Sequence, residues 1–441
     1  MIKKFVLPMI GLFLMSTVMQ ASFKKEDIQV HQLDNGLKII FYEDHTIPSI
    51  SYYTFFRVGS RNERPGLTGI SHFIEHMMFN GTQKFGPGEF DRLMEFYGGS
   101  NNAYTSDDLT AYTDWFPPQA LEKMVELEAD RMQSLIFDPE VFESERGVVA
   151  SERRMGVENN NEALLYENVR ATAIMAHPYH WDVIGWMSDI LSWRREEVIQ
   201  YYRTYYAPNN AVVVVAGDFD PGKTLELIKK YYSDIPSQTP PSPVSTIEPP
   251  QMGRKEVVIK KQAQSPSFQV VYHAPNCRAA DFLALSILEK PLIQGESSRL
   301  YRRLVRQEQL AISVFGGISE TIDPQLFFIS VQPRPEADLT KIEKIIDEEL
   351  NRVVEQGITD QEYQKALNII RSNFYSSLQT NSGKANQLGS NELLYGSYEN
   401  LFTMVEQYSQ VKREDIPGIA KKYFNELNKT VGKLIPQGGN Q

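Results

Sequence analysis

At 441 residues the chain is too long for one ordinary core, so its length favours two or more domains. Its composition, 41% hydrophobic and 23% charged, is typical of a globular protein and excludes a disordered one. The net charge of −11 argues against nucleic acid and anionic lipid as partners, and the single cysteine, Cys277, excludes a disulfide within the chain.

The first 21 residues have the pattern of an export signal. A basic start, MIKK, precedes the apolar run FVLPMIGLFLMSTV, and Ala21 offers a small residue for cleavage before Ser22. The apolar run is short for a membrane-spanning helix, and no later run is long enough to span a bilayer. We therefore expect a secretory signal peptide over residues 1–21 and a periplasmic or secreted protein without stable membrane insertion. The alternative is an uncleaved membrane anchor.

Residues 68–81 have the pattern of an amphipathic helix. Thr68 is a suitable N-cap and Asn80–Gly81 a suitable end. Between them the apolar residues follow the spacing of a buried stripe, whereas His72, Glu75 and His76 fall on the opposite face. The pattern therefore predicts a helix that buries its apolar side and directs three polar groups elsewhere.

The three polar groups form the motif H-x-x-E-H, which is typical of a zinc site. Two histidines at i and i+4 can bind one cation through their ring nitrogens, and neutral imidazole suits Zn²⁺. Glu75 is poorly placed to be a third ligand beside His76, so we predict that it acts as the general base that takes a proton from a metal-activated water. The alternative is a pair of histidines held by structural hydrogen bonds.

A third ligand is expected from another segment, and FESERGVVASERRM offers two candidates. Glu145 and Glu152 are seven residues apart, so they lie two helical turns apart on one face. Either could reach the metal while the other supports the site, and the spacing does not choose between them. A solvated charged face is the alternative interpretation of this segment.

The proline-rich stretch PSQTPPSPVSTIEPP predicts a linker between two halves. We expect a first domain over residues 22–236, a linker over 237–253 and a second domain over 254–441. Both halves open with strand-like runs, QVHQLDNGLKIIFYED and RKEVVIKK followed by SFQVVYHAP, and then alternate helical patterns with short strands. This order favours two α+β domains.

The two halves resemble each other, which predicts an internal duplication. SHFIEHMMFNG aligns with LSILEKPLIQG, and FESERGVVASE aligns with YQKALNIIRSN. Chance similarity between helical patterns is the alternative. Under the duplication, the polar residues of the first half correspond to residues that cannot bind zinc in the same way: His72, His76, Glu145 and Glu152 correspond to Ser286, Lys290, Ala366 and Asn373.

Several motifs together resemble the pitrilysin and insulinase-type zinc peptidases, in the short form that includes mitochondrial processing peptidase. They are the H-x-x-E-H segment from Gly69 to Thr82, GGSNNAYTSDDLTAY from Gly98, ERGVVASE from Glu145, HPY from His177 and SSRLYRRL from Ser297. The resemblance implies two similar α+β domains, each with a mainly antiparallel sheet packed with helices, forming half of a clamshell chamber.

The resemblance also implies roles for single residues. His72, His76 and Glu152 would bind one zinc per chain, Glu75 would be the general base, and Glu145 would be the supporting carboxylate. Asn102, Ala103 and Tyr104 would lie on an edge strand to which an extended peptide substrate adds as a further strand. An ordinary buried strand is the alternative for that segment.

One segment departs from the family pattern. Members that work alone usually carry an arginine and a tyrosine around a G-L-A-Y pattern, whereas this chain has LVRQEQLAIS from Leu304, with Val305, Gln309 and Ile312 in place of the arginine, the glycine and the tyrosine. Arg306 is one position away and could compensate, but Ile312 cannot donate a hydrogen bond. The chain thus resembles the zinc-bearing subunit of the two-subunit branch.

The sequence therefore predicts a secreted zinc endopeptidase that cuts extended peptides or unfolded segments. We expect it to be the catalytic subunit of a heterodimer whose related, exported partner supplies the arginine and tyrosine. A self-sufficient homodimer that uses Arg306, and a non-catalytic core subunit of a larger complex, are the alternatives.

Overall fold

The computed structural model describes residues 23–437. The segment predicted to be a signal peptide lies outside these residues. Within the described range, no helix is both long and apolar enough to cross a membrane.

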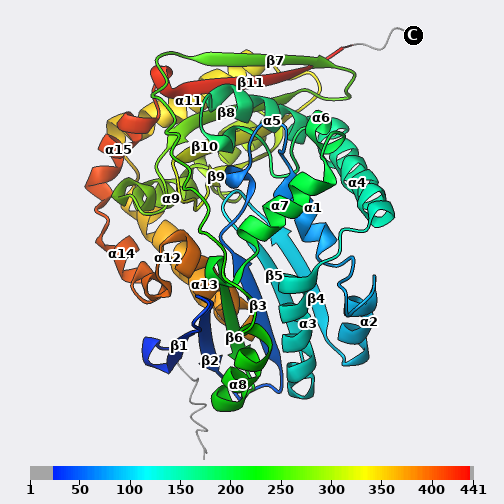
Figure 1. Cartoon of the computed structure of the whole chain (residues 1–441). Coiled ribbons are helices and arrows are strands. Elements are labelled where there is room, and N and C mark those ends of the chain that lie inside the picture. Colours follow the sequence, from blue (N-terminus) through cyan, green and yellow to red (C-terminus); the bar gives the residue numbers. More distant parts are fainter. Residues whose placement is uncertain (1–22, 438–441) are drawn as a thin grey trace, which may run out of the picture.

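The first half is built on a six-stranded sheet with the order β1-β2-β6-β3-β5-β4 (Figure 1). Neighbouring strands are antiparallel except β2 and β6, which run parallel. Strand β4 therefore forms one edge of the sheet and β1 the other. The strands are β1 (Ile28–Gln32), β2 (Lys38–Glu43), β3 (Ile50–Phe56), β4 (Ser100–Thr105), β5 (Thr110–Phe116) and β6 (Ala211–Gly217).

The second half repeats this topology without the first strand. Its sheet has the order β7-β11-β8-β10-β9, again with one parallel pair, β7 and β11, and with β9 at an edge. The order matches β2-β6-β3-β5-β4, so β9 takes the place of β4. The predicted α+β fold with two similar halves is confirmed. The strands are β7 (Lys255–Lys261), β8 (Ser267–Ala274), β9 (Ala311–Ile318), β10 (Gln325–Pro333) and β11 (Lys429–Pro436).

Helices cover one face of each sheet with apolar side chains and form the two main cores. The helices of the first half are α1 (Ile70–Met77), α2 (Glu89–Phe96), α3 (Leu121–Ser134), α4 (Pro139–Arg153), α5 (Asn161–Ala173), α6 (Met187–Ile190), α7 (Arg195–Tyr205) and α8 (Pro221–Tyr232). Those of the second half are α9 (Ala280–Leu292), α10 (Arg299–Tyr301), α11 (Leu339–Gln356), α12 (Asp360–Ser377), α13 (Asn381–Leu394), α14 (Met404–Gln410) and α15 (Ile416–Tyr423).

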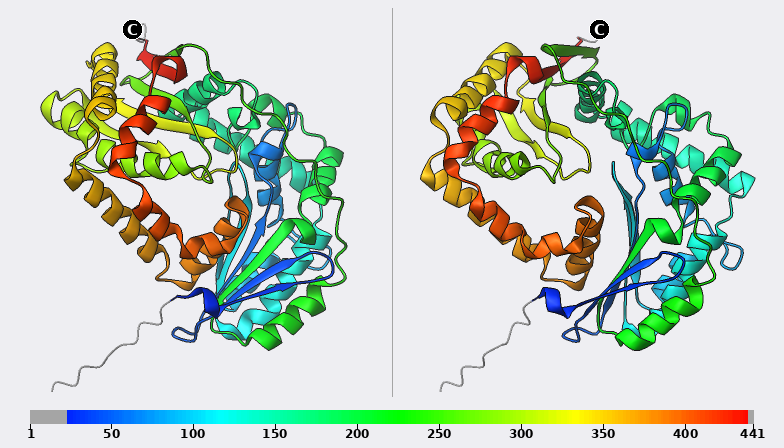
Figure 2. Two further views of the ribbon diagram at one scale, coloured as in Figure 1. Left: turned by 90° about the vertical axis from the view of Figure 1, so that its left-hand side faces the viewer. Right: turned by 60° about the vertical axis from the view of Figure 1, so that its left-hand side comes forward.

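Two helices pack on the sheet of the opposite half. Helix α5 lies against β7, β8 and β11, and α13 lies against β3 and β6 (Figure 2). Both contacts are close, because a Cβ on Gly432 of β11 would lie 2.1 Å from Val169 of α5, and a Cβ on Gly389 of α13 would lie 2.0 Å from Phe55 of β3. The reciprocal exchange joins the two halves into one packed unit.

The proline-rich segment between α8 and β7 contains no helix or strand. It is nevertheless tied down, because the Glu248 carboxylate accepts hydrogen bonds from the backbone N–H groups of Met175, Ala176 and His177 at 2.8 to 2.9 Å. The segment thus runs along the end of α5, which itself belongs to the packing of the second sheet.

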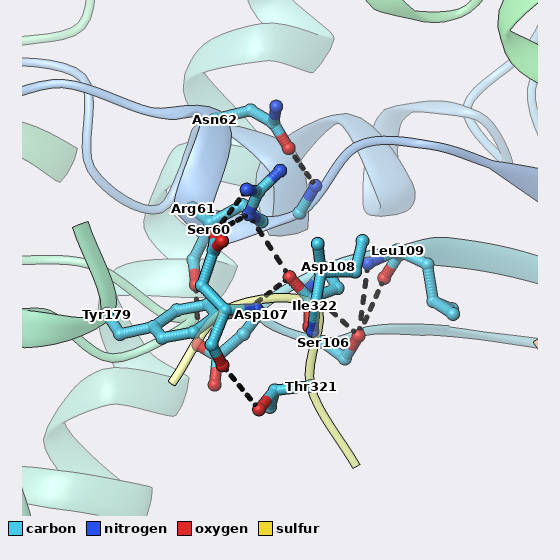
Figure 3. A network of polar contacts seen from close by, with 12 residues as sticks. Ser60, Arg61, Asn62, Ser106, Asp107, Asp108, Leu109, Tyr179, Thr321 and Ile322 are labelled. Carbon is cyan, nitrogen blue, oxygen red and sulfur yellow. Dashed lines mark hydrogen bonds and ion pairs between the residues drawn. The ribbon is translucent and has the colours of Figure 1, made fainter. Parts of the chain in front are cut away.

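A polar network joins the turns of the two edge hairpins (Figure 3). Asp108, in the β4–β5 turn, accepts hydrogen bonds from the Tyr179 hydroxyl at 2.5 Å and from the backbone N–H of Ile322 at 3.0 Å. Arg61 Nε lies 3.2 Å from the same buried carboxylate. Because Ile322 lies between β9 and β10, the end of β4 is held by both halves of the chain.

Candidate metal centre

Helix α1 presents the H-x-x-E-H motif as the sequence pattern predicts. Ile70, Phe73, Ile74 and Met77 are fully buried against the helical layer, whereas the two histidines and Glu75 are only partly buried. The hydrophobic effect therefore fixes the rotation of the helix, and the three polar groups share its other side.

Helix α1 is shorter at both ends than the sequence pattern predicts, since it ends at Met77 and not at Asn80. The helix begins at Ile70 after Gly69, which has φ 84°, and Thr68 does not cap it. The Thr68 hydroxyl donates to Asp189 instead, at 2.8 Å. The cap comes from Glu63, whose carboxylate accepts hydrogen bonds from the backbone N–H groups of Gly69 and Ser71, both at 2.8 Å. A long-range carboxylate thus replaces the local hydroxyl that the sequence suggested.

Glycine is required before α1 because two backbone segments meet there. A Cβ on Gly69 would lie 2.3 Å from the carbonyl oxygen of Ile184, and the positive φ also disfavours other residues. The first turn of the motif helix is therefore anchored to the segment that precedes α6.

Three side chains converge beside α1. His72 Nε2 and His76 Nε2 are 3.2 Å apart, and Glu152 Oε2 from α4 lies 3.9 Å from the first and 3.4 Å from the second. One possible ligand atom from each residue lies within 4.8 Å of the others, with each side chain partly buried. The structure thus brings together the two histidines and the later of the two candidate glutamates.

This arrangement fits a zinc ion. Two ligand atoms about 2.0 to 2.1 Å from one zinc at a tetrahedral angle are about 3.3 Å apart, which agrees with two of the three distances. Two histidine and one carboxylate ligands also form a recurrent donor set of catalytic zinc sites and leave a fourth position for water or substrate. Without a cation, at most one of the facing Nε2 atoms could satisfy the other by donating a proton.

Glu145 occupies a supporting position. Its Oε1 lies 2.7 Å from His76 Nδ1, and its Oε2 accepts a hydrogen bond from Asn80 Nδ2 at 3.0 Å. If His76 donates from Nδ1 to this carboxylate, its Nε2 lone pair points towards the converging atoms. Asn80 was expected only to end the helix, and its link to Glu145 could not be seen from the sequence.

The Glu75 side chain extends from α1 to the end of the edge strand β4. Its Oε2 accepts a hydrogen bond from the Thr105 hydroxyl at 2.6 Å. Burial raises the pKa of Glu75 above its ordinary value, and the Thr105 hydrogen bond partly opposes this rise. Thr105 belongs to GGSNNAYTSDDLTAY, one of the segments that resemble the family, but nothing in the sequence linked its hydroxyl to Glu75.

The pKa values of the two histidines are shifted in opposite directions. Burial, and then the neighbouring His76, lower the pKa of His72 to about 4, so His72 is neutral near pH 7. Burial also lowers the pKa of His76, but the hydrogen bond to Glu145 and the charge of Glu152 outweigh it and leave this pKa raised. The acidic groups around His76 are thus ready to stabilise positive charge at this point.

Asn102, Ala103 and Tyr104 lie on β4, at the edge of the first sheet and beside α1. The Ala103 N–H donates to the neighbouring Asn102 side chain at 2.9 Å, and Tyr104 is 37% exposed. The Tyr104 hydroxyl donates to Asn386 of α13 at 2.9 Å. These residues therefore line an exposed strand edge close to the converging side chains.

The segment that departs from the family pattern lies at the start of β9. Arg306 is an exposed residue that pairs with the exposed Glu296, and Val305 packs against the second core. Ile312 is 48% exposed on the edge strand. Among the described residues, no hydrogen bond or ion pair joins Val305, Arg306 or Ile312 to the converging groups of α1 and α4.

Comparison with known families and sequences finds matches along most of the chain. The family described as "Insulinase (Peptidase family M16)" matches residues 38–185, and the one described as "Peptidase M16 inactive domain" matches residues 192–370. The zinc protease PqqE of Helicobacter pylori is 32% identical over 92% of both chains. The uncharacterized zinc protease YmxG of Bacillus subtilis is 24% identical over 90% of this chain and 96% of its own.

Comparison with solved structures gives the same result for the fold. A protease from Helicobacter pylori superposes with a TM-score of 0.89 at 31% identity, covering 93% of this chain and 99% of the other. A protein from Pseudomonas fluorescens described as a peptidase M16 inactive domain gives 0.85 at 16% identity, with coverage of 94% and 99%. The periplasmic protease PqqL of Escherichia coli gives 0.77 at 20% identity, and the match covers 94% of this chain but 48% of PqqL.

Proposed function

Because this chain belongs to the insulinase family of zinc peptidases, peptidase family M16, we propose that it is an active zinc endopeptidase. One zinc per chain would be held by His72, His76 and Glu152. The observation that carries the proposal is the convergence of these three side chains within 4.8 Å, with Glu75 on α1, the helix that carries both histidines.

The residues around the site suit the hydrolysis of a peptide bond. Bound zinc supplies a Lewis acid that polarises the scissile carbonyl and lowers the pKa of a water molecule. Glu75 accepts the proton of the attacking water and returns it to the leaving amine, a role that suits a buried carboxylate with a raised pKa. Glu145 holds His76 through Nδ1 and thereby keeps its Nε2 available as a ligand.

The exposed edge of β4 suits an extended peptide or an unfolded segment as substrate. Such a peptide would add as a further strand alongside Asn102, Ala103 and Tyr104, with its backbone paired to the free edge. Thr105, the last residue of β4, is bonded to Glu75, so a peptide on this edge would run past the general base. The first half would thus bind both zinc and substrate, and the second half would bind no zinc.

We further propose that the chain acts as the catalytic subunit of a two-chain enzyme. Val305 and Ile312 offer no side-chain donor for the oxyanion, and Arg306 is paired with Glu296 at the surface. The fold of this chain corresponds to about half of PqqL, so a second such unit could complete the chamber as a related partner. The basic and apolar pattern of residues 1–21 supports export to the periplasm, in which this partner would also reside.

Metal removal tests the proposed function. An unstructured peptide should be cleaved by the purified, zinc-loaded chain with its partner, cleavage should stop when a chelator removes the zinc, and added Zn²⁺ should restore it. The physical reason is that the ligands by themselves provide no Lewis acid. Cleavage that continues at the same rate in the metal-free protein would overturn the proposal.

A further inference from the structure

The Glu75 carboxylate is held at one oxygen by a residue of the edge strand. The Thr105 hydroxyl donates to Glu75 Oε2 at 2.6 Å. This distance is short for a hydrogen bond between two neutral groups and typical of one that a charged carboxylate accepts. Both side chains are partly buried, so water competes weakly for this contact. Oε2 accepts this hydrogen bond, whereas Oε1 accepts none among the described residues and is the more accessible oxygen for a further proton.

Thr105 is itself firmly placed. Its hydroxyl lies 3.4 Å from that of Thr110, which donates to the carbonyl oxygen of Val58 at 2.9 Å. The next residue, Ser106, begins the turn that the network around Asp108 ties to both halves of the chain (Figure 3). The hydroxyl therefore has a fixed position from which it can hold the carboxylate in one orientation.

The second half has helices in the corresponding places, but they do not carry the three metal-binding side chains. Four residues of α9 and α12 that correspond to the site line one cavity of about 360 Å³. They are Ser286, Glu289, Lys290 and Asn373, in the places of His72, Glu75, His76 and Glu152. The glutamate is thus retained where all three ligands are replaced.

The retained Glu289 is held differently from Glu75. Its Oε1 pairs with the Lys290 ammonium at 2.8 Å, and its Oε2 lies 3.4 Å from the backbone nitrogen of Ile318. Ile318 is the last residue of β9 and takes the place of Thr105 at the end of β4. The fold therefore does not require a hydroxyl at this strand end, and the copy with the metal-binding side chains is the one that has it.

We propose that Thr105 is a positioning residue for the general base: its hydroxyl fixes the Glu75 carboxylate so that the free oxygen faces the attacking water. This inference rests on the proposed function. Since Thr105 belongs to the strand that would pair with the substrate, it also links the peptide-binding edge to the base. Loss of the hydroxyl should slow the chemical step and leave zinc binding and peptide binding intact.

The test compares Thr105→Val, which removes the hydroxyl at nearly constant volume, with Thr105→Ser, which retains it. Thr105→Val should lower kcat by about tenfold to a hundredfold, the usual effect of losing a hydrogen bond to a charged group, with KM within about twofold and one zinc per chain. Thr105→Ser should restore most of the rate. Thr224→Val is the matched control, because Thr224 is a fully buried threonine whose hydroxyl has no hydrogen-bond partner among the described residues.

The inference is wrong if Thr105→Val keeps the wild-type kcat, if its loss of activity comes from lost zinc, or if the folded Thr105→Ser variant is as slow as Thr105→Val. A measurement without turnover separates this inference from the proposed function. In crystals of the zinc-loaded protein, Glu75 should adopt one orientation in the wild type and more than one in Thr105→Val. A single unchanged orientation in the variant would overturn the inference even if the wild type proved inactive.

Discussion

Glu145 and Glu152 share one face of α4 but contact different atoms around α1. Glu152 Oε2 lies beside both Nε2 atoms, whereas Glu145 lies beside His76 Nδ1 and Asn80. The two carboxylates are two turns apart on α4, so Glu145 reaches Nδ1 of the His76 ring and Glu152 reaches its Nε2. The proposed roles, Glu152 as ligand and Glu145 as support, therefore follow from the position of each residue along α4.

We expect Glu152→Gln to weaken zinc binding more than Glu145→Gln does. The first change removes the charge of a carboxylate that would bond to the cation, and the second removes only the partner of a ligand, which typically costs about 10- to 100-fold in affinity. The two variants are matched in chemistry and lie on the same helix. A zinc titration that gave the reverse ranking would assign the ligand role to Glu145.

At this scale the sequence identified the residues that share one local pattern. The spacing within α1 placed His72, Glu75 and His76 on one face, because helical geometry is fixed by nearby residues. It could not choose between Glu145 and Glu152, nor find the Thr105 and Glu63 contacts, because those depend on how distant segments pack. The prediction that Thr68 caps α1 was wrong because the cap is a long-range contact with Glu63, which the local sequence does not reveal.

The packing partners of helices α5 and α13 could not be predicted from the sequence pattern. The apolar pattern of a helix predicts which side is buried, but it does not say which sheet covers that side. The opening strands of each half and the resemblance between the two halves followed from local patterns. The exchange of α5 and α13 did not, because each helix lies in one half of the sequence and packs on the other.

We expect Gly389→Ala to destabilise the protein by about 1 to 3 kcal/mol, the usual cost of overpacking a close contact. Its new Cβ would lie 2.0 Å from the Phe55 ring, so α13 would have to move away from the first sheet. Gly418→Ala in α15 is the matched control, since no atom lies within 4 Å of its new Cβ and alanine favours a helix over glycine. Denaturant unfolding should show a lower midpoint for the first variant only, and equal midpoints would contradict the exchanged packing.

The two halves form one packed unit, and among residues 23–437 only the first half brings together a cluster of metal-binding side chains. The second half has Ser286, Lys290 and Asn373 at the corresponding places and presents Ile312 on its edge strand. In the proposed hydrolysis, the oxyanion would therefore lack the two donors expected from the family pattern and would depend on the bound metal. The two-chain proposal assigns the remaining donors to a second chain.

We expect a related exported chain that carries the arginine and tyrosine to raise peptide turnover by about a hundredfold or more. A single oxyanion donor is typically worth about 10² to 10³ in rate, and the partner would supply one or two. Titration of the partner into a fixed amount of this chain measures the effect. Full activity of the lone chain that no partner changes would contradict the two-chain proposal; a concurrent loss in Arg306→Ala would favour the homodimer that uses this arginine.

In the proposed mechanism, Glu75 moves protons while His72, His76 and Glu152 bind the metal. The most direct measurement is the zinc content of Glu75→Gln together with its turnover of an unstructured peptide. Because the amide keeps the shape of the side chain but cannot accept the water's proton, the variant should retain one zinc per chain and lose cleavage by several orders of magnitude. A variant that still cleaves at the wild-type rate, or one that loses its zinc, would contradict this assignment.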